Sequence, residues 1–85
     1  AAADSLDTVA VRAELFGDAL ASGDPAIITS ALGLIARARG MSALAKETVL
    51  SRETLYKAFS EGGNPTLDTL LKVTQALGVR LSIAA

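Results

Sequence analysis

Residues that begin helices alternate closely with residues that end them, and this alternation limits the chain to short helices. Asp24-Pro25 joins an N-cap residue to the residue that suits the first helical position. Gly23, Gly40 and Gly78 each follow an apolar run, where a glycine commonly ends a helix. The spacing of these signals predicts an all-α fold in which no helix exceeds about four turns.

Apolar residues spaced three and four apart predict five helices between these signals. The expected helices cover residues 6–21, 25–38, 43–48, 52–60 and 67–77. Their expected N-caps are, in order, Asp4 or Ser5, then Asp24, Ser42, Ser51 and Thr66. The second helix is apolar on most faces, so we expect it to be the buried centre of a five-helix bundle.

Two helices have a clear apolar stripe, and the end of the chain has a different pattern. The first helix is expected to pack through Leu6, Val9, Ala13, Phe16 and Leu20. The fifth is expected to pack through Leu67, Leu70, Leu71, Val73 and Leu77. Val79, Leu81 and Ile83 alternate with polar residues, which predicts a short C-terminal β-strand at 79–83.

The composition excludes most catalytic chemistry. The 85 residues include neither cysteine nor histidine, so thiol chemistry, the commonest general base and the usual zinc ligands are missing. An enzyme, a metal site and a cofactor are therefore not expected. The length allows one small domain, which must build its core from Ala, Leu, Ile and Val because only 4% of the residues are aromatic.

No segment is expected to enter or cross a membrane. The longest mostly apolar run, residues 26–36, is about half the length that a bilayer requires, and Thr29 and Ser30 interrupt it. The N-terminus lacks the basic start of a signal peptide. We therefore expect a cytoplasmic protein, and the absence of cysteine fits a reducing compartment.

The charges are distributed unevenly along the chain. Residues 1–36 carry a net charge of −4, since five acidic residues are opposed by one arginine. Residues 37–85 carry +3, from seven basic and four acidic residues. This asymmetry is compatible with an anionic partner at one end of the molecule, and equally with scattered solvated charge.

Residues 41–60 have the pattern of two short helices joined by a turn that is too short to let them separate. Their expected inward positions are Leu44, Leu50, Leu55 and Ala58. The outer face of the second helix then carries Arg52, Glu53, Tyr56 and Lys57. Polar side chains concentrated on one short exposed helix are what the reading of base edges in the DNA major groove requires. An ordinary helical hairpin with a solvated face is the alternative.

The same segment resembles the helix-turn-helix of phage-repressor and Cro-like (Xre) transcription factors. More closely, residues 24–82 resemble the HigA-like addiction-module antidote proteins, which are antitoxins of bacterial toxin–antitoxin operons. The most specific parts are GDPA at 23–26, IARARGMS at 35–42 and LSRETLYKAFS at 50–60. The resemblance implies a lambda-repressor-like domain that dimerises on a palindromic DNA operator, represses its operon and neutralises a RelE/ParE-like (HigB) ribonuclease toxin.

Carried onto this sequence, the resemblance places the recognition helix at residues 51–59. Its base-reading positions are Ser51, Arg52, Glu53 and Lys57, with Tyr56 beside them. The resemblance puts Ser42 over a backbone phosphate, whereas Asn64 and the amide groups at Thr66 can meet a phosphate because a helix N-terminus attracts anions. Tyr56 has two open roles: a hydroxyl contact with phosphate, or a ring that covers the edge of the core.

One position departs from the family pattern. Most helix-turn-helix motifs have glycine at the turn position where this chain has Val49. A left-handed conformation costs a β-branched residue about 1–2 kcal/mol. Either Val49 is strained, or the preceding helix ends differently and shifts the recognition helix.

These observations divide the single domain into an acidic N-terminal helix at 1–23, a DNA-binding core at 24–78 and a tail at 79–85. The leading hypothesis is an antitoxin that represses its own operon, with double-stranded operator DNA, a toxin and a second copy of the chain as partners. A stand-alone Xre-type repressor and a helical protein–protein adaptor that does not bind DNA are the alternatives.

Two surfaces are expected to bind protein partners. Val11 and Leu15, flanked by the acidic Glu14 and Asp18, are expected to contact the toxin. Packing of the two apolar residues on a neighbouring helix is the alternative. Val79, Leu81 and Ile83 are expected to form the homodimer by pairing two tails across a two-fold axis.

Overall fold

The computed structural model describes residues 8–83, and within this part it contains five helices and no strand. The helices are α2 (Val9–Ser22), α3 (Pro25–Arg39), α4 (Met41–Thr48), α5 (Arg52–Ala58) and α6 (Leu67–Ala76). The predicted all-α class is confirmed. The expected caps Asp4 and Ser5, and the apolar Leu6, lie outside the described residues.

Four of these helices begin at a side chain that accepts a hydrogen bond from the first turn. The predicted caps Asp24, Ser51 and Thr66 accept from backbone N–H groups at 2.9, 3.0 and 3.1 Å. Thr8 does the same for α2 at 3.2 Å. Since an N-cap satisfies an N–H group that has no partner within the helix, these residues fix where the helices begin.

The boundary between α3 and α4 differs from the prediction because a single glycine separates the two helices. Gly40 has a φ of 106°, and the helices are bent by 100° across it. Ser42 therefore lies inside the first turn of α4 rather than at its N-cap, and α4 has no side-chain cap. Within residues 8–83 no single helix is long and apolar enough to span a membrane, and only α3 and α4 counted together across this bend reach that length and hydropathy.

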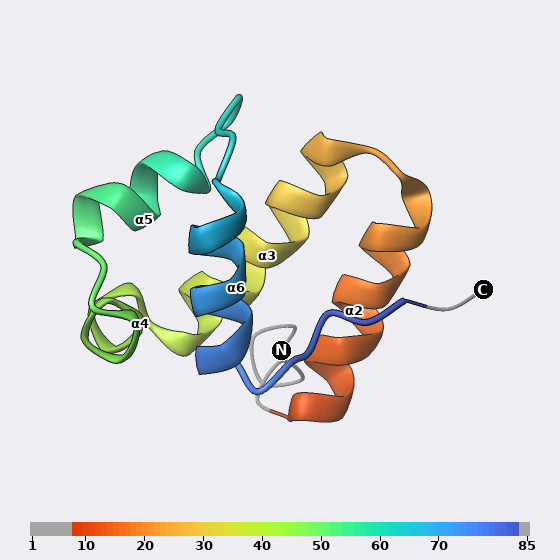
Figure 1. Cartoon of the computed structure of the whole chain (residues 1–85), viewed down its shortest axis with the longest axis horizontal. Helices are drawn as coiled ribbons and strands as arrows, with labels where there is room; N and C mark the ends of the chain where they lie inside the picture. Colours follow the sequence, from red (N-terminus) through yellow and green to blue (C-terminus); the bar gives the residue numbers. More distant parts are fainter. Residues whose placement is uncertain (1–7, 84–85) are drawn as a thin grey trace.

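The helix α3 lies at the centre of the arrangement (Figure 1). α2 packs along α3, whereas α4 contacts α3, α5 and α6. α4 and α5 lie at one end of the long axis and α2 lies at the other, in a molecule that measures 34 × 27 × 21 Å. α3 is less enclosed than predicted, because Ile27 and Leu34 are 49% and 52% exposed.

The core is built from aliphatic side chains and both phenylalanines, and every helix contributes to it. Its buried members are Phe16, Leu32, Ile35, Ala36, Met41, Leu44, Leu55, Ala58, Phe59, Val73, Leu77 and Val79. Each large aliphatic side chain removed from water in this way stabilises the fold by roughly 1.5–3 kcal/mol. Arg12 adds a polar link, because its Nη1 donates to the carbonyl oxygen of Leu77 at 3.1 Å and so ties α2 to the end of α6.

α2 packs through a different face from the one predicted. Phe16 and Ala19 are buried, and Val11 and Leu15 are half-buried against the core. The exposed members of the predicted stripe are Val9, Ala13 and Leu20. α2 is apolar on two adjacent faces that share Phe16, so its own sequence does not determine which face packs. Contact with α3 selects the face that carries Val11 and Leu15.

α6 also exposes residues that were predicted to be buried. Leu67 and Leu71 lie on its solvent side, whereas Thr69 and Thr74 are buried. The hydroxyl of Thr74 donates to the carbonyl oxygen of Leu70 at 2.9 Å, so its burial leaves no polar group unsatisfied. Hydrogen bonds to the backbone of its own helix therefore allow threonine to occupy core positions that an apolar pattern assigns to leucine.

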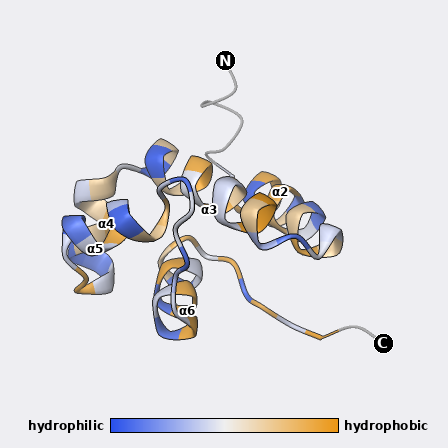
Figure 2. Ribbon diagram, turned by 90° about the horizontal axis from the view of Figure 1, so that it is seen from above, coloured by the Kyte–Doolittle hydropathy of each residue, from blue (hydrophilic) through white to orange (hydrophobic). Residues whose placement is uncertain are grey.

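The predicted C-terminal strand is absent, and the prediction is wrong for the described chain. Residues 79–83 leave α6 as an extended tail with no other extended segment beside them in the part that the structure describes (Figure 2). The N–H of Val79 donates to the carbonyl oxygen of Thr74 at 2.9 Å, and its side chain is buried. Leu81 and Ile83 are exposed. A β-ladder requires a second strand, so the alternating pattern produces only an extended segment within one chain.

Val49 has a strained backbone. This is the first of the two alternatives that the sequence left open for the turn. Its φ of 60° and ψ of 19° are left-handed, and no other non-glycine residue among 8–83 has a positive φ. The side chain is 90% exposed, so it gains almost no packing energy in return. The turn therefore carries a local cost of about 1–2 kcal/mol.

Replacement of Val49 by glycine should stabilise the fold. Val49→Gly removes the Cβ clash, worth about 1–2 kcal/mol, and adds a backbone entropy cost of about 0.5–1 kcal/mol. We expect the free energy of unfolding, measured by urea denaturation, to rise by about 0.5–1 kcal/mol. Val49→Ala keeps a Cβ and is the matched control, for which a smaller gain is expected. A Val49→Gly protein no more stable than the wild type would contradict the strain.

Candidate nucleic-acid interface

A buried hydroxyl fixes the turn between α4 and α5. Thr48 is 5% exposed, and its Oγ1 donates to the carbonyl oxygen of Leu44 at 2.7 Å. The same oxygen accepts from the N–H of Leu50 at 3.3 Å. Val49, Leu50 and Ser51 are then the three residues between the helices. The sequence pattern did not indicate this role, because a threonine near a helix end is usually solvated.

The two helices pack against each other through the residues that the pattern predicted. Leu44, Leu55 and Ala58 are buried, and Leu50 is half-buried against the core. With Leu55 and Ala58 directed inward, α5 turns its other face to solvent. The exposed side chains of that face are Arg52, Glu53, Tyr56 and Lys57.

Ser51 is exposed at the start of α5, but its hydroxyl is largely engaged. Its Oγ accepts from the N–H of Thr54 at 3.0 Å and donates to Thr54 Oγ1 at 2.7 Å. A serine hydroxyl has one proton and two lone pairs, so Ser51 can act as the cap and still take part in a further hydrogen bond. The predicted contact of Ser51 with bases or phosphates stays a prediction.

Three basic side chains at this end of the molecule form no ion pair within the described residues. Arg39 pairs with Glu47 on α4, and Lys72 pairs with Asp68 on α6 at 2.9 Å. In the described part of the chain, Lys46, Arg52 and Lys57 form no ion pair with a carboxylate. Arg52 instead lies over the ring of Tyr56, with its guanidinium carbon 5.7 Å from the ring centroid.

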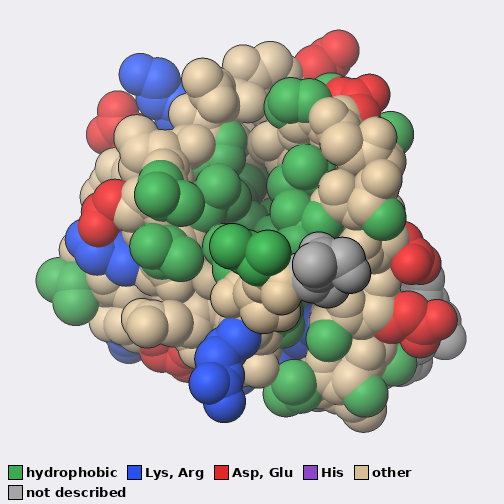
Figure 3. All heavy atoms as spheres, turned by 45° about the vertical axis from the view of Figure 1, so that its right-hand side comes forward, with side chains coloured by type: hydrophobic (Ala, Val, Ile, Leu, Met, Phe, Trp, Pro, Cys, Tyr) green, Lys and Arg blue, Asp and Glu red, His purple; other side chains and the backbone are tan. Residues whose placement is uncertain are grey.

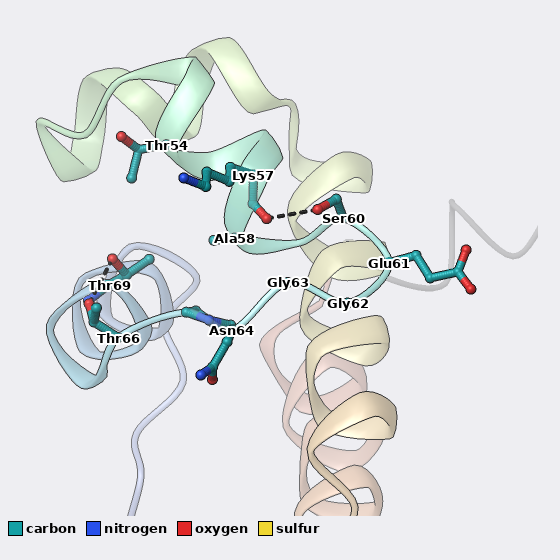
Figure 4. A pocket seen from close by; sticks show the side chains of 11 residues that line it. Thr54, Lys57, Ala58, Ser60, Glu61, Gly62, Gly63, Asn64, Thr66 and Thr69 are labelled. Carbon is teal, nitrogen blue, oxygen red and sulfur yellow. Dashed lines mark hydrogen bonds between the residues drawn. The ribbon is translucent and has the colours of Figure 1, made fainter.

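A groove of about 580 Å³ lies between the end of α5 and the start of α6 (Figure 4). Lys57, Asn64 and Thr66 line it, so three of the predicted DNA-contact residues surround one hollow. The hydroxyl of Thr66 caps α6, and the positive end of that helix lies beside the groove. Ser42 does not line it and is exposed in the first turn of α4.

The far end of α5 is held by a residue of α3. Arg37 Nη2 donates to the carbonyl oxygen of Phe59 at 3.2 Å. Gly33 provides the room, because a Cβ there would lie 2.9 Å from Arg37 Nη1 and 3.2 Å from Phe59 Cβ. Arg37 lies in the last turn of α3. Its contact joins residues 22 apart, which no local pattern indicates.

The loop between α5 and α6 approaches the backbone of α5 very closely at Gly63. Its N–H donates to the carbonyl oxygen of Ser60 at 2.8 Å. A Cβ at this position would lie 2.4 Å from the carbonyl oxygen of Ala58 and 2.7 Å from that of Lys57. Because only glycine permits this approach, the loop and Asn64 have a fixed position relative to α5.

The four residues of α2 that were predicted to bind a partner differ in their exposure to solvent. Glu14 and Asp18 are exposed, whereas Val11 and Leu15 pack against the core, as in the alternative left open for them. Figure 3 shows acidic side chains at several places around the edge of the molecule and hydrophobic side chains around a shallow hollow in the middle of the same face. Of the four residues predicted to bind a partner, the two carboxylates are the more accessible.

The described residues contain no evident metal site. Nowhere between residues 8 and 83 do three or more carboxylate side chains gather closely enough to bind a metal ion. The titratable side chains of α4 and α5 all lie at the surface. The fold and the site thus define a small helical protein that exposes the polar face of a short helix.

The family of the chain agrees with this class. The whole chain, residues 1–85, matches the family model described as "Probable addiction module antidote protein", and the chain belongs to that family. An antidote of an addiction module is an antitoxin, so the family description names a class of antitoxins.

One curated relative is an uncharacterized protein of Haemophilus influenzae, which is 53% identical over 57 residues. The match covers 67% of this chain and 59% of the relative, so the chain spans less than two thirds of that protein's length. No solved structure matches the chain at a significant level.

Proposed function

We propose that this chain is an antitoxin that binds the DNA operator of its own operon through α5 and represses transcription in the cytoplasm. The observation that carries the DNA-binding half is the exposed polar face of α5, attached to α4 by a turn of three residues. The family description supports the antitoxin half. In this proposal α4 and α5 form a helix-turn-helix of the Xre type, and α5 is the recognition helix.

The N-terminal end of α5 would read bases. Recognition helices enter the major groove with their N-terminal residues against the base edges, and Arg52 is the first residue of α5. Its guanidinium can donate two hydrogen bonds to guanine O6 and N7, and Glu53 can accept one from the amino group of cytosine. Ser51, whose hydroxyl also contacts Thr54 Oγ1, can accept from a base amino group.

The groove beside α5 would receive a phosphate of the DNA backbone. Lys57 supplies a positive charge there, and Asn64 and the amide groups at Thr66 supply donors. Ser42, in the first turn of α4, would meet a second phosphate. Contacts of this kind set the position and orientation of a protein on the duplex, whereas base contacts set its sequence preference.

Two substitutions on α5 should have different consequences for DNA binding. Arg52→Ala should weaken binding by about 1–3 kcal/mol and relax the preference at one base position, because a bidentate contact is lost. Lys57→Ala should weaken all sequences alike and reduce the salt slope by about one, because one phosphate contact is lost. Fluorescence anisotropy with DNA from upstream of the gene, titrated at several salt concentrations, measures both effects.

Lys72→Ala is the matched control for this experiment. It removes one positive charge that is already paired with Asp68 on α6, so a much smaller effect is expected. Equal, sequence-independent losses for Arg52→Ala and Lys57→Ala would show that the readout is assigned wrongly. Absence of any salt-dependent, sequence-dependent binding by the wild type would refute the DNA-binding half of the proposal.

The toxin would bind at the acidic end of the molecule. We propose a RelE/ParE-like (HigB) ribonuclease as partner, on the strength of the family resemblance and of the exposed Glu14 and Asp18, with the half-buried Val11 and Leu15 on the same helix.

Complementary charge mainly accelerates association. The double substitution Glu14→Lys/Asp18→Lys should therefore slow association with a basic toxin encoded beside the gene by at least about tenfold at low salt. Glu61→Lys, in the loop after α5, is the control; identical association rates for all three proteins would exclude this surface.

A homodimer would complete the DNA-binding unit. We propose that the tail contacts a second copy through Leu81 and Ile83, since Val79 is already buried in its own domain. A two-fold axis would set two copies of α5 about 34 Å apart, one turn of DNA, and would require a palindromic operator.

The double substitution Leu81→Asp/Ile83→Asp should give a monomer in sedimentation equilibrium. Both side chains are exposed, so their replacement leaves the core covered. A double variant that remains dimeric would place the interface elsewhere.

A further inference from the structure

Arg52 and Tyr56 are one helical turn apart on the exposed face of α5. The guanidinium carbon lies over the ring at 5.7 Å from its centroid, within the range in which a ring face attracts a cation. Tyr56 is 45% exposed, and its side chain has fewer rotatable bonds than that of arginine. The ring therefore provides a platform for the longer and more flexible arginine side chain.

The ring is the contact that restrains Arg52 in the described structure. Among residues 8–83 no carboxylate forms an ion pair with its guanidinium. Contact with a ring uses the flat face of the guanidinium and leaves the N–H groups at its edge free. Those N–H groups are the ones that a bidentate contact with guanine needs.

We propose that Tyr56 is a positioning residue for sequence readout, whose ring orders Arg52 before DNA is bound and whose side chain contacts neither base nor phosphate. This inference rests on the proposed function, because it explains a sequence preference only if Arg52 reads a base. It takes the place of the two roles first considered for Tyr56, a hydroxyl contact with phosphate and a cover for the core edge.

An ordered arginine changes specificity more than general affinity. A flexible side chain loses conformational freedom when it makes two directed hydrogen bonds, and an arginine that is already ordered loses less. This gain is realised only on a duplex that offers guanine at the correct position. Removal of the ring should therefore weaken the preferred sequence and leave mismatched sequences nearly unaffected.

Two variants separate the ring from the hydroxyl. Tyr56→Phe keeps the ring and removes the hydroxyl, whereas Tyr56→Leu keeps an apolar side chain and removes the ring. Leucine and phenylalanine are both compatible with a helix, so both proteins should melt near the wild-type temperature, as followed by circular dichroism. Arg52→Ala and the double variant Arg52→Ala/Tyr56→Leu complete a thermodynamic cycle.

The probes are the duplex that the wild-type protein enriches from a randomised DNA library and its single-base variants. Tyr56→Phe should bind all of them like the wild type. Tyr56→Leu should bind the enriched duplex about two- to five-fold more weakly and lose preference at the same base as Arg52→Ala. In the Arg52→Ala background, Tyr56→Leu should have no further effect.

Three results would overturn the inference: equal losses for Tyr56→Phe and Tyr56→Leu, a loss that is uniform across all duplexes, or an undiminished loss in the Arg52→Ala background. The first two would assign Tyr56 to a phosphate contact or to general stability. A wild-type protein that enriches no sequence would instead refute the proposed function, and this inference with it.

A second measurement tests the contact without DNA. A ring in this position should shift the NMR resonances of the Arg52 δ-methylene protons, and Tyr56 is the sole tyrosine of a chain without tryptophan. The shift should persist in Tyr56→Phe and disappear in Tyr56→Leu. Identical arginine resonances in the wild type and Tyr56→Leu would exclude a preformed contact, whatever the DNA titrations show.

Discussion

The shortness of α5 is the constraint on which the rest of the structure depends. Seven residues are too few for a helix that is stable alone in water, so α5 forms only where other parts of the chain support it. Leu55 and Ala58 are buried in the core, and Ser51 caps the first turn. At the other end, Arg37 donates to the last turn and Gly63 brings the next loop against it. The outer face is thereby presented in a fixed orientation.

The helices could largely be predicted from the sequence because their signals are local. Asp24, Ser51 and Thr66 act on the first turn that follows them, so their role is visible in a few neighbouring residues. The packed face of α2 could not be predicted in this way. That helix is apolar on two sides, and only its contact with α3 distinguishes them. The prediction of a C-terminal strand was wrong for a related reason. An alternating pattern indicates which side chains of a strand share a face, but it does not indicate whether a second strand exists to pair with it.

In the candidate site, too, features set by neighbouring residues could be predicted, whereas contacts between distant parts of the chain could not. The outward residues of α5 follow from helical periodicity once the inward ones are recognised, so their exposure was predicted correctly. Two of the contacts that hold α5 in place were missed, those of Arg37 and Gly63. Arg37 reaches a carbonyl group 22 residues away, and Gly63 is required because of a backbone that passes within van der Waals contact. Such contacts depend on the path of the chain in space, which periodicity does not describe.

The separation of the two charged ends has a consequence for how DNA and a toxin would act on one protein. α5 and the exposed carboxylates of α2 lie at opposite ends of the long axis, which measures 34 Å, so one chain can offer both surfaces at once. At physiological ionic strength the Debye length is about 8 Å, and charge at one end has little direct effect on the other. Any influence of toxin binding on DNA binding must therefore pass through packed contacts, such as those of α3 with α2 and of Arg37 with α5, or through the arrangement of two copies. In the second case the exposed tail, rather than α5 itself, is where the two proposed activities would meet.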